Sequence, residues 1–116
     1  MITGVHTLIY AHDEAAARAF FTDVLGLPHV DAGGGWLIFR SGPSELAIHP
    51  TERPLAHELT FMCDDLDATI ADLRAKGAEF DGEVGDEMWG RTIHVRVPGA
   101  STILIYEPKH PTALDR

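Results

Sequence analysis

The chain is poor in cysteine, in long apolar runs and in positive charge. Its single cysteine, Cys63, excludes an intramolecular disulfide and reads as a buried strand residue. The longest apolar runs have the length of strands, and residues 1–4 lack the basic region and apolar block of a secretory signal. We therefore expect a cytoplasmic protein without a membrane partner.

Positive charge is outnumbered by negative charge. The chain has 9 lysine and arginine residues against 18 aspartate and glutamate residues, a formal net charge of −9. Such a surface repels phosphate backbones and argues against a nucleic-acid partner. Hydrophobic residues make up 45% of the 116 residues, which is ordinary for a globular domain. This length and composition predict one compact domain over residues 1–116.

The sequence contains two similar halves. Residues 6–13 match residues 58–65, and an alanine-rich amphipathic run follows each of them. His6 falls on Glu58, so each half carries a polar residue at the matching point. Self-similarity at a fixed offset marks a duplicated supersecondary unit. We expect a two-module domain with a site between the modules.

Each module is predicted to have the order β-α-β-β-β. Module one covers about residues 4–50, with a helix between Asp13 and Gly26 and strands at 4–11, 29–32, 36–40 and 44–49. Module two covers about residues 56–109, with a helix from Asp64 or Asp65 to Gly77 and strands at 58–63, 79–81, 92–97 and 102–106. The acidic, glycine-rich residues 82–90 are expected to form a loop that lids the site.

Strand alternation assigns side chains to two faces of the sheet. Leu59, Phe61 and Cys63 form an apolar face suited to packing under a helix, so Glu58 points to the opposite, concave face. The same argument places further side chains on the concave face: His6, Tyr10, Glu45, His49, His94, Leu104 and Tyr106. The concave face should therefore collect His6, Glu45 and Glu58.

These motifs resemble the vicinal oxygen chelate superfamily. The resemblance covers residues 4–109 and rests on three motifs: Val24-Leu25-Gly26-Leu27, Asp64-Asp65-Leu66-Asp67 and Tyr106-Glu107-Pro108. It implies the glyoxalase/bleomycin resistance fold, an α+β fold in which two tandem βαβββ modules form a curved mixed sheet around a cleft. The superfamily includes glyoxalase I, bleomycin resistance proteins and extradiol dioxygenases, so the fold alone identifies no activity.

The resemblance also implies metal ligands in the first and last strands of each module. Those positions hold His6, Glu45, Glu58 and Leu104, of which the first three can bind one divalent ion such as Mn, Fe, Co, Ni, Zn or Mg. Glu45 or Glu58 would then serve as the catalytic base. Leu104 stands where the glyoxalase-like pattern has a carboxylate, and His57 would replace Glu58 if the strand held a one-residue bulge. The alternative is that these polar residues line a wet pocket without an ion.

Other residues are candidates for contact with a substrate. Tyr10, Trp36, Trp89 and Tyr106 could line an aromatic slot, although Trp36 also suits the core or a subunit contact. His94 is either a substrate contact or a spare ligand. We expect a small-molecule-binding protein whose cleft is metal-free or weakly metal-binding. The alternative is a divalent-metal-dependent lyase, isomerase or dioxygenase acting on an oxygen-chelating small substrate.

The resemblance and the sheet edges together predict a homodimer. Two small modules each leave a sheet edge to cover, and superfamily members of this length generally pair. Whether the modules pair within one chain or swap between chains is open, because the connection around Pro54 permits either. Residues 109–116 are expected to be mobile or to dock on the partner subunit.

Overall fold

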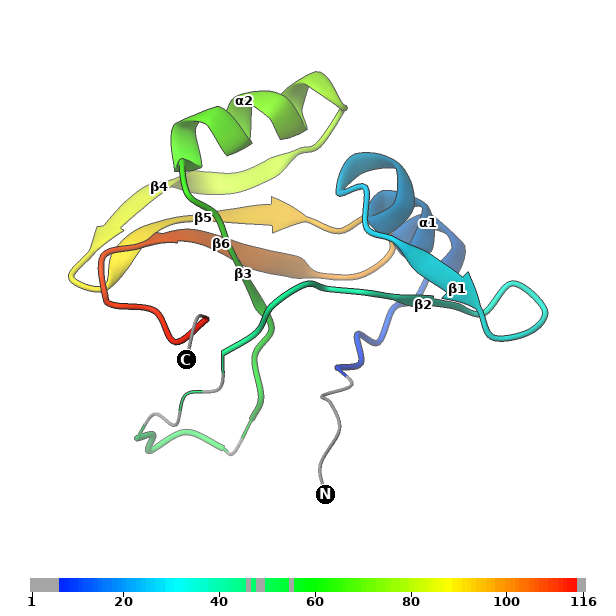
Figure 1. The fold of residues 1–116 in the computed structure, drawn as a ribbon, viewed down its shortest axis with the longest axis horizontal. Helices are drawn as coiled ribbons and strands as arrows, with labels where there is room; N and C mark the ends of the chain where they lie inside the picture. The colour runs from blue at the N-terminus through cyan, green and yellow to red at the C-terminus, as the bar shows by residue number, and fades with distance from the viewer. Residues whose placement is uncertain (1–6, 46, 48–49, 55, 115–116) are drawn as a thin grey trace.

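The computed structural model describes residues 7–45, 47, 50–54 and 56–114. Its elements, in chain order (Figure 1), are α1 Glu14–Ala19, the π-helical turn η1 Phe20–Val24, β1 His29–Asp31, β2 Leu37–Phe39, β3 Thr60–Met62, α2 Leu66–Ala75, β4 Phe80–Glu87, β5 Gly90–Arg96 and β6 Thr102–Pro108. Within the described residues, no helix has both the length and the apolar character needed to cross a bilayer. The α+β fold class is confirmed.

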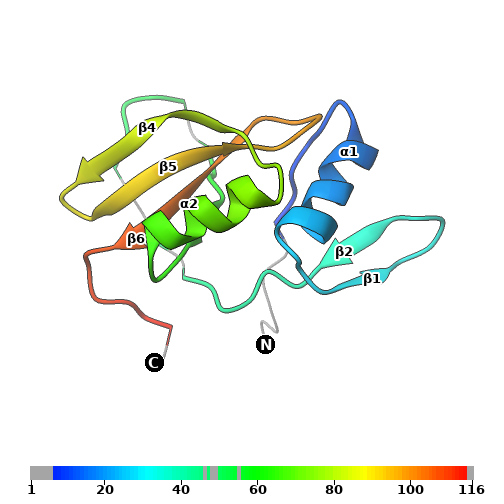
Figure 2. The ribbon, with the colours of Figure 1, turned by 90° about the horizontal axis from the view of Figure 1, so that it is seen from above.

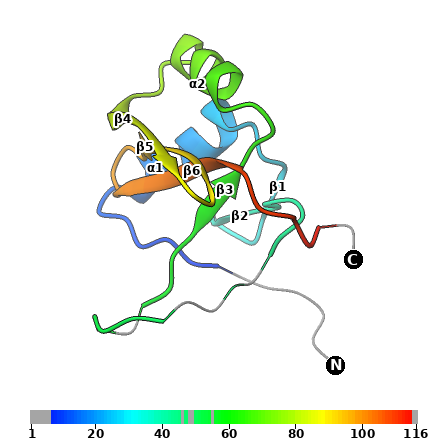
Figure 3. The same ribbon diagram turned by 90° about the vertical axis from the view of Figure 1, so that its left-hand side faces the viewer.

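A four-stranded mixed sheet forms the centre of the structure, with the order β3-β6-β5-β4. Strand β3 pairs with β6 in parallel, whereas β5 pairs with β6 and β4 pairs with β5 in antiparallel fashion. Figures 1 and 3 show α2 on one side of this sheet, and the described parts of the β2–β3 connection on the other side. The hairpin of β1 and β2 forms a separate, two-stranded sheet.

The core lies between the helices and the helix side of this sheet. Alternate residues of β5 and β6 are buried there, together with the inward face of α2: Ile93, Val95, Ile103, Ile105, Leu66, Ile70 and Leu73. Ala17, Phe20 and Phe21 of α1 and η1 complete the cluster. The two-residue period of the strands and the helical spacing of the apolar residues therefore agree on one core.

Both predicted helix starts are capped by an aspartate. Asp13 accepts a hydrogen bond from the Ala16 amide at 3.0 Å, and Asp65 accepts one from the Ala68 amide at 3.0 Å. Such caps satisfy amides that have no partner within the helix. Gly26 follows the first helix with a φ of 67°, a conformation that glycine adopts without strain.

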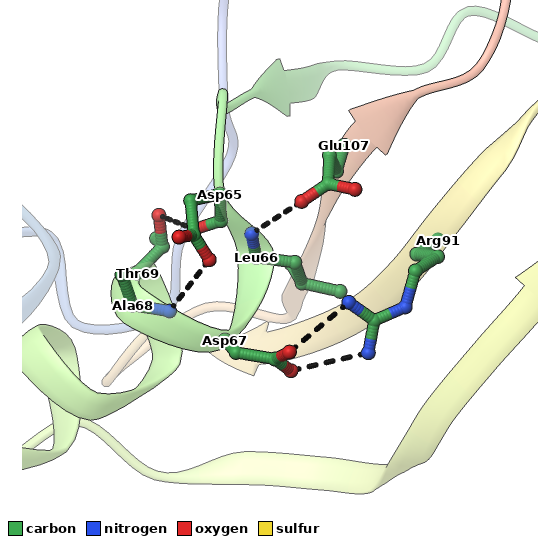
Figure 4. Close-up of polar contacts among 7 residues, drawn as sticks. All are labelled: Asp65, Leu66, Asp67, Ala68, Thr69, Arg91 and Glu107. Atoms are coloured by element: carbon green, nitrogen blue, oxygen red, sulfur yellow. Dashed lines mark hydrogen bonds and ion pairs between the residues drawn. The ribbon is translucent and has the colours of Figure 1, made fainter.

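The first turn of α2 is also held by the sheet beneath it (Figure 4). The Glu107 carboxylate of β6 accepts a hydrogen bond from the Leu66 amide at 2.9 Å. Arg91 of β5 donates to both oxygens of Asp67 at 3.1 and 3.3 Å. These contacts hold the pKa of the Asp67 carboxyl below its usual range, through the hydrogen bonds first and the guanidinium charge second.

The prediction of four strands in module one is wrong within the described residues. Residues 7–11 and the described part of residues 44–49 belong to no strand. Alternation identifies which face a strand would bury, but a strand also needs a neighbour to pair its amides and carbonyls. Residues 7–10 are exposed instead, so the described sheet of module one is the β1–β2 hairpin alone.

The predicted lid loop at residues 82–90 is wrong as well. Strand β4 continues to Glu87, and only Met88 and Trp89 form the turn to β5. Two glycines of this segment, Gly85 and Gly90, permit close packing between strands. A Cβ at Gly85 would lie 2.6 Å from the Thr92 hydroxyl, and one at Gly90 would lie 2.7 Å from the Glu107 carbonyl oxygen.

The start of α1 is joined to the β5–β6 turn by a close backbone contact. The Asp13 amide donates to the Gly99 carbonyl at 3.0 Å, and Figure 2 shows the β5–β6 turn beside the start of α1. Gly99 has a φ of 76°, and a Cβ there would lie 2.3 Å from the Asp13 carbonyl oxygen. Only glycine fits this turn without moving α1.

We predict that Gly99→Ala destabilises the fold more than Gly82→Ala does. Both positions have positive φ, so each substitution should cost about 1–2 kcal/mol of unfolding free energy in backbone strain. Nothing lies within 4 Å of a Cβ at Gly82, whereas the clash at Gly99 should add roughly 1–3 kcal/mol. Urea unfolding of the two variants would measure the difference. Equal losses of unfolding free energy would contradict the close approach of Gly99 to Asp13.

Candidate functional site

The candidate site lies on the face of the four-stranded sheet opposite α2, which we call the open face. Register places two rows of side chains on it: Thr60, Leu104 and His94 in one, and Met62, Tyr106 and Thr92 in the other. Their neighbours in sequence point into the helix-side core. Strand alternation thus predicted both faces of β5 and β6 correctly.

Tyr106 is the most enclosed aromatic residue of the open face, with 9% of its surface exposed. The Trp89 ring meets it edge to face, with centroids 5.2 Å apart and planes at 77°. Gly90 makes room for the tyrosine ring, since a Cβ there would lie 2.9 Å from Cδ2 of Tyr106. Trp89 and Tyr106 therefore form an aromatic corner at one end of the sheet.

Glu45 approaches this corner from the β2–β3 connection. Burial raises the pKa of the Tyr106 hydroxyl, and the negative charge of Glu45 raises it further. Glu45 is itself half-buried. The structure thus brings together three of the predicted site residues, Glu45, Trp89 and Tyr106, from three separate parts of the chain.

Residues 109–114, which we call the C-terminal segment, fold back onto the same corner. The Lys109 amide donates to the Trp89 carbonyl at 2.9 Å, and the Ala113 amide donates to the Glu45 carboxylate. His110 Nε2 lies 3.0 Å from the Tyr106 hydroxyl, with the two rings 5.8 Å apart. The segment that was expected to be mobile or to dock on a partner subunit therefore contacts its own chain.

His110 was not among the predicted site residues. One sequence signal could have found it: a histidine four residues beyond Tyr106, directly after the last strand, stays near the strand end. The Pro111 carbonyl can only accept, and it lies 2.7 Å from Nδ1 of His110. Nδ1 of the neutral ring therefore carries the proton, which leaves Nε2 to accept from the Tyr106 hydroxyl.

The other residues predicted to contact a substrate do not lie with Trp89 and Tyr106 in the described structure. Trp36 precedes β2, is 63% exposed and has the Arg18 guanidinium 5.5 Å from its ring centroid. Figures 1 and 2 show the β1–β2 turn and the β4–β5 turn at opposite ends of the molecule. Tyr10 is 87% exposed, and His94 is exposed on the open face.

The predicted metal ligands are only partly described. His6 and His49 lie outside the described residues, whereas Glu58 and its neighbour His57 are both exposed. Leu104 is half-buried on the open face and offers no ligand atom. Among the described residues, no three His, Cys, Asp or Glu side chains gather at one point. The described residues alone do not fit an ion, so the metal site remains a prediction that needs His6.

A groove of about 990 Å³ lies elsewhere, between α1, η1 and the ends of β4, β5 and β6. The groove is lined in part by Arg96 of β5. Its guanidinium is paired with Asp81 at 3.1 Å. None of the predicted site residues lines this groove, so the aromatic corner is the better candidate site.

The effect of the Glu45 charge on the pKa of Tyr106 can be tested by titration. In a Tyr10→Phe background Tyr106 is the only tyrosine, since the chain has two. Its hydroxyl should ionise above the ordinary pKa of about 10. Glu45→Gln should lower this pKa without restoring the ordinary value, because burial remains. Tyrosinate absorbance measures it, and Glu83→Gln is the control of equal charge on the helix side. If the pKa of Tyr106 is unchanged in Glu45→Gln, the Glu45 charge does not act on the Tyr106 hydroxyl.

Solved structures with the same fold are known. An antibiotic-binding protein, TnmS3 from Streptomyces sp. CB03234, superposes with a TM-score of 0.65 at 23% identity, over 93% of this chain and 98% of its own. A lactoylglutathione lyase from Agrobacterium tumefaciens gives a TM-score of 0.65 at 22% identity, over 90% and 92%. A glyoxalase/bleomycin resistance protein/dioxygenase from Nocardioides gives 0.61 at 21% identity, over 97% and 91%. At these identities the likeness shows the fold alone.

Sequence comparison agrees with the structural likeness. A search of curated proteins gave no match. One family model matches residues 4–110, which is nearly the whole chain. The chain belongs to the Glyoxalase/Bleomycin resistance protein/Dioxygenase superfamily.

Proposed function

We propose that this protein binds a flat or cationic small molecule at the aromatic corner of the open face, in a site that is metal-free or weakly metal-binding. The arrangement of Trp89, Tyr106 and Glu45 is the observation that supports this function most directly. Two perpendicular rings offer a face and an edge to a planar compound, and a nearby carboxylate attracts positive charge. The likeness to an antibiotic-binding protein is consistent with it.

Charge pairing on the sheet supports a cationic ligand. Asp67, Asp81 and Asp86 are paired with Arg91, Arg96 and Lys109, respectively. Within the part of the chain that the structure describes, Glu45 has no such ion pair and accepts only from a neutral amide. Its negative charge is therefore available to a ligand cation.

A second function, a divalent-metal-dependent lyase, isomerase or dioxygenase, is supported by Glu45 and Glu58. With His6 they would hold an ion that polarises an oxygen-chelating small substrate, and one carboxylate would serve as the base. The likeness to a lactoylglutathione lyase is consistent with this alternative. Leu104 on the open face argues against a four-ligand site.

Ethidium and phenanthridine test the proposal, because they share one planar ring system and only ethidium carries a fixed charge. In a Trp36→Phe background Trp89 is the only tryptophan, so its fluorescence reports binding. We expect ethidium to bind the parent protein. Trp89→Leu should weaken the affinity for ethidium roughly threefold to thirtyfold, measured by calorimetry because this variant lacks the fluorescent reporter. Glu45→Gln should weaken ethidium but not phenanthridine, and Glu83→Gln should weaken neither.

Metal titration separates the two functions. If the parent protein binds neither planar compound at millimolar concentration but binds Mn, Ni or Zn stoichiometrically in calorimetry, the proposed function is wrong and the alternative stands. Leu104→Glu should then strengthen metal binding, because it adds a fourth ligand. With the proposed function, the same substitution only adds a charge beside Tyr106.

We also propose that residues 1–116 form one two-module domain that assembles as a homodimer. Module one leaves apolar side chains exposed: Leu8, Tyr10, Val30, Trp36 and Ile38. A two-stranded hairpin is marginal on its own, and clustered exposed apolar residues mark interfaces. A partner subunit would cover this surface.

We predict that light scattering gives twice the 12.7 kDa mass of one chain at micromolar concentration. Val30→Glu places a charge among the exposed apolar residues of module one and should weaken the dimer at least tenfold. Val84→Glu is the matched control, because Val84 is 40% exposed on β4. A monomer mass for the parent protein would exclude the dimer.

A further inference from the structure

The C-terminal segment contacts the candidate site through groups that resemble those of a small ligand. Beyond Lys109 it has no regular secondary structure. Its side-chain-mediated contacts with the candidate site are one imidazole beside Tyr106 and one backbone amide that donates to the Glu45 carboxylate. The imidazole ring is flat, tilted by 36° from the tyrosine ring, and presents an acceptor nitrogen to the hydroxyl.

We propose that the C-terminal segment occupies the ligand site, and that the ligand is a planar nitrogen heteroaromatic compound that displaces it. This inference rests on the proposed function and adds the chemistry of the ligand. The ligand accepts a hydrogen bond from the Tyr106 hydroxyl through a ring nitrogen, as His110 does. It also donates an N–H hydrogen bond to Glu45, as Ala113 does.

The contacts of the segment divide into an anchor and an occupant. Lys109 continues the β-sheet pairing through the Trp89 carbonyl, and its ammonium group contacts Asp86 and the Glu87 carbonyl. These contacts lie at the strand ends and involve neither the Tyr106 hydroxyl nor the Glu45 carboxylate. Residues 110–114 can therefore leave the corner while Lys109 stays in place.

Competition by an internal segment has a measurable consequence. The apparent affinity of a ligand is reduced by the fraction of molecules in which its site is free. One hydrogen bond of the segment favours the occupied state by roughly threefold to tenfold. Removing one contact of the segment should therefore increase ligand affinity, up to roughly tenfold.

Benzimidazole is the probe, because it combines a planar ring, an acceptor nitrogen and an N–H donor. Its analogue 1-methylbenzimidazole has the same ring and lacks the donor. Calorimetry should show that benzimidazole binds the parent protein, and that the methylated analogue binds at least tenfold more weakly. Equal affinities would exclude the hydrogen bond to Glu45.

Two variants of the full chain remove the occupant's contacts. Ala113→Pro deletes the amide that donates to Glu45, and His110→Ala deletes the imidazole. Each should bind benzimidazole roughly threefold to tenfold more tightly than the parent. Ala113→Ser keeps the amide and should match the parent, with thermal melting confirming that all three variants fold.

Hydrogen exchange tests the displacement without relying on affinity. The Ala113 amide should exchange at least tenfold faster in Glu45→Gln than in the parent, because its acceptor is weakened. Saturating benzimidazole should accelerate the same amide in the parent protein. If benzimidazole slows this exchange, the C-terminal segment stays in place and covers the bound ligand, and the inference is wrong.

The outcomes separate this inference from the function on which it rests. If the parent binds ethidium but Ala113→Pro and His110→Ala bind benzimidazole no more tightly than it does, the segment is not a competitor and the proposed function stands. If ethidium, phenanthridine and benzimidazole all fail to bind at millimolar concentration, the proposed function fails as well.

Discussion

Strand β6 is the constraint on which the rest of the described structure depends. It lies inside the four-stranded sheet and pairs with β3 on one side and β5 on the other. Ile103 and Ile105 are buried under the helices, with 6% and 3% of their surfaces exposed. A slip of one residue would exchange the two faces of the strand and expose both isoleucines. Burial of these two side chains therefore directs Leu104 and Tyr106 to the open face.

The end of β6 links the helix to the candidate site. Glu107 accepts from the first amide of α2, while its neighbour Tyr106 points the opposite way into the aromatic corner. Adjacent residues of one strand necessarily face opposite sides. The contact that holds the helix start thus also limits how far Tyr106 can move. Gly90 of β5 completes the arrangement, because any larger residue would collide with the tyrosine ring.

Local patterns in the sequence predicted the parts of the fold that depend on neighbours along the chain. The aspartate caps at Asp13 and Asp65, and the alternation in β5 and β6, need no long-range information. Residues 7–11 show similar alternation but have no strand in the described structure, because pairing depends on a partner that alternation does not identify. The glycines of residues 82–90 suggested a loop, although two of them serve close packing with Thr92 and Glu107.

The candidate site was harder to predict than the fold, since its parts come from separate segments. Strand alternation placed Tyr106 on the correct face and assigned Glu45 to the same concave side. The aromatic-slot hypothesis grouped Trp89 with Tyr106, but it expected Trp89 in a long loop and not in a two-residue turn. His110 and Ala113 lie beyond the last strand, where periodicity gives no direction. Their positions depend on the Tyr106 hydroxyl and the Glu45 carboxylate, which only the folded chain brings together.

The charges around the corner support the proposed displacement of residues 110–114. Lys109 neutralises Asp86 at the strand end, so the anchor of the C-terminal segment is an ion pair. Farther along, Ala113 gives Glu45 a hydrogen bond but no positive charge. The carboxylate is thus satisfied as an acceptor and remains charged, in a protein with a formal net charge of −9. A ligand that supplies both an N–H donor and positive charge would interact with Glu45 more strongly than the amide does.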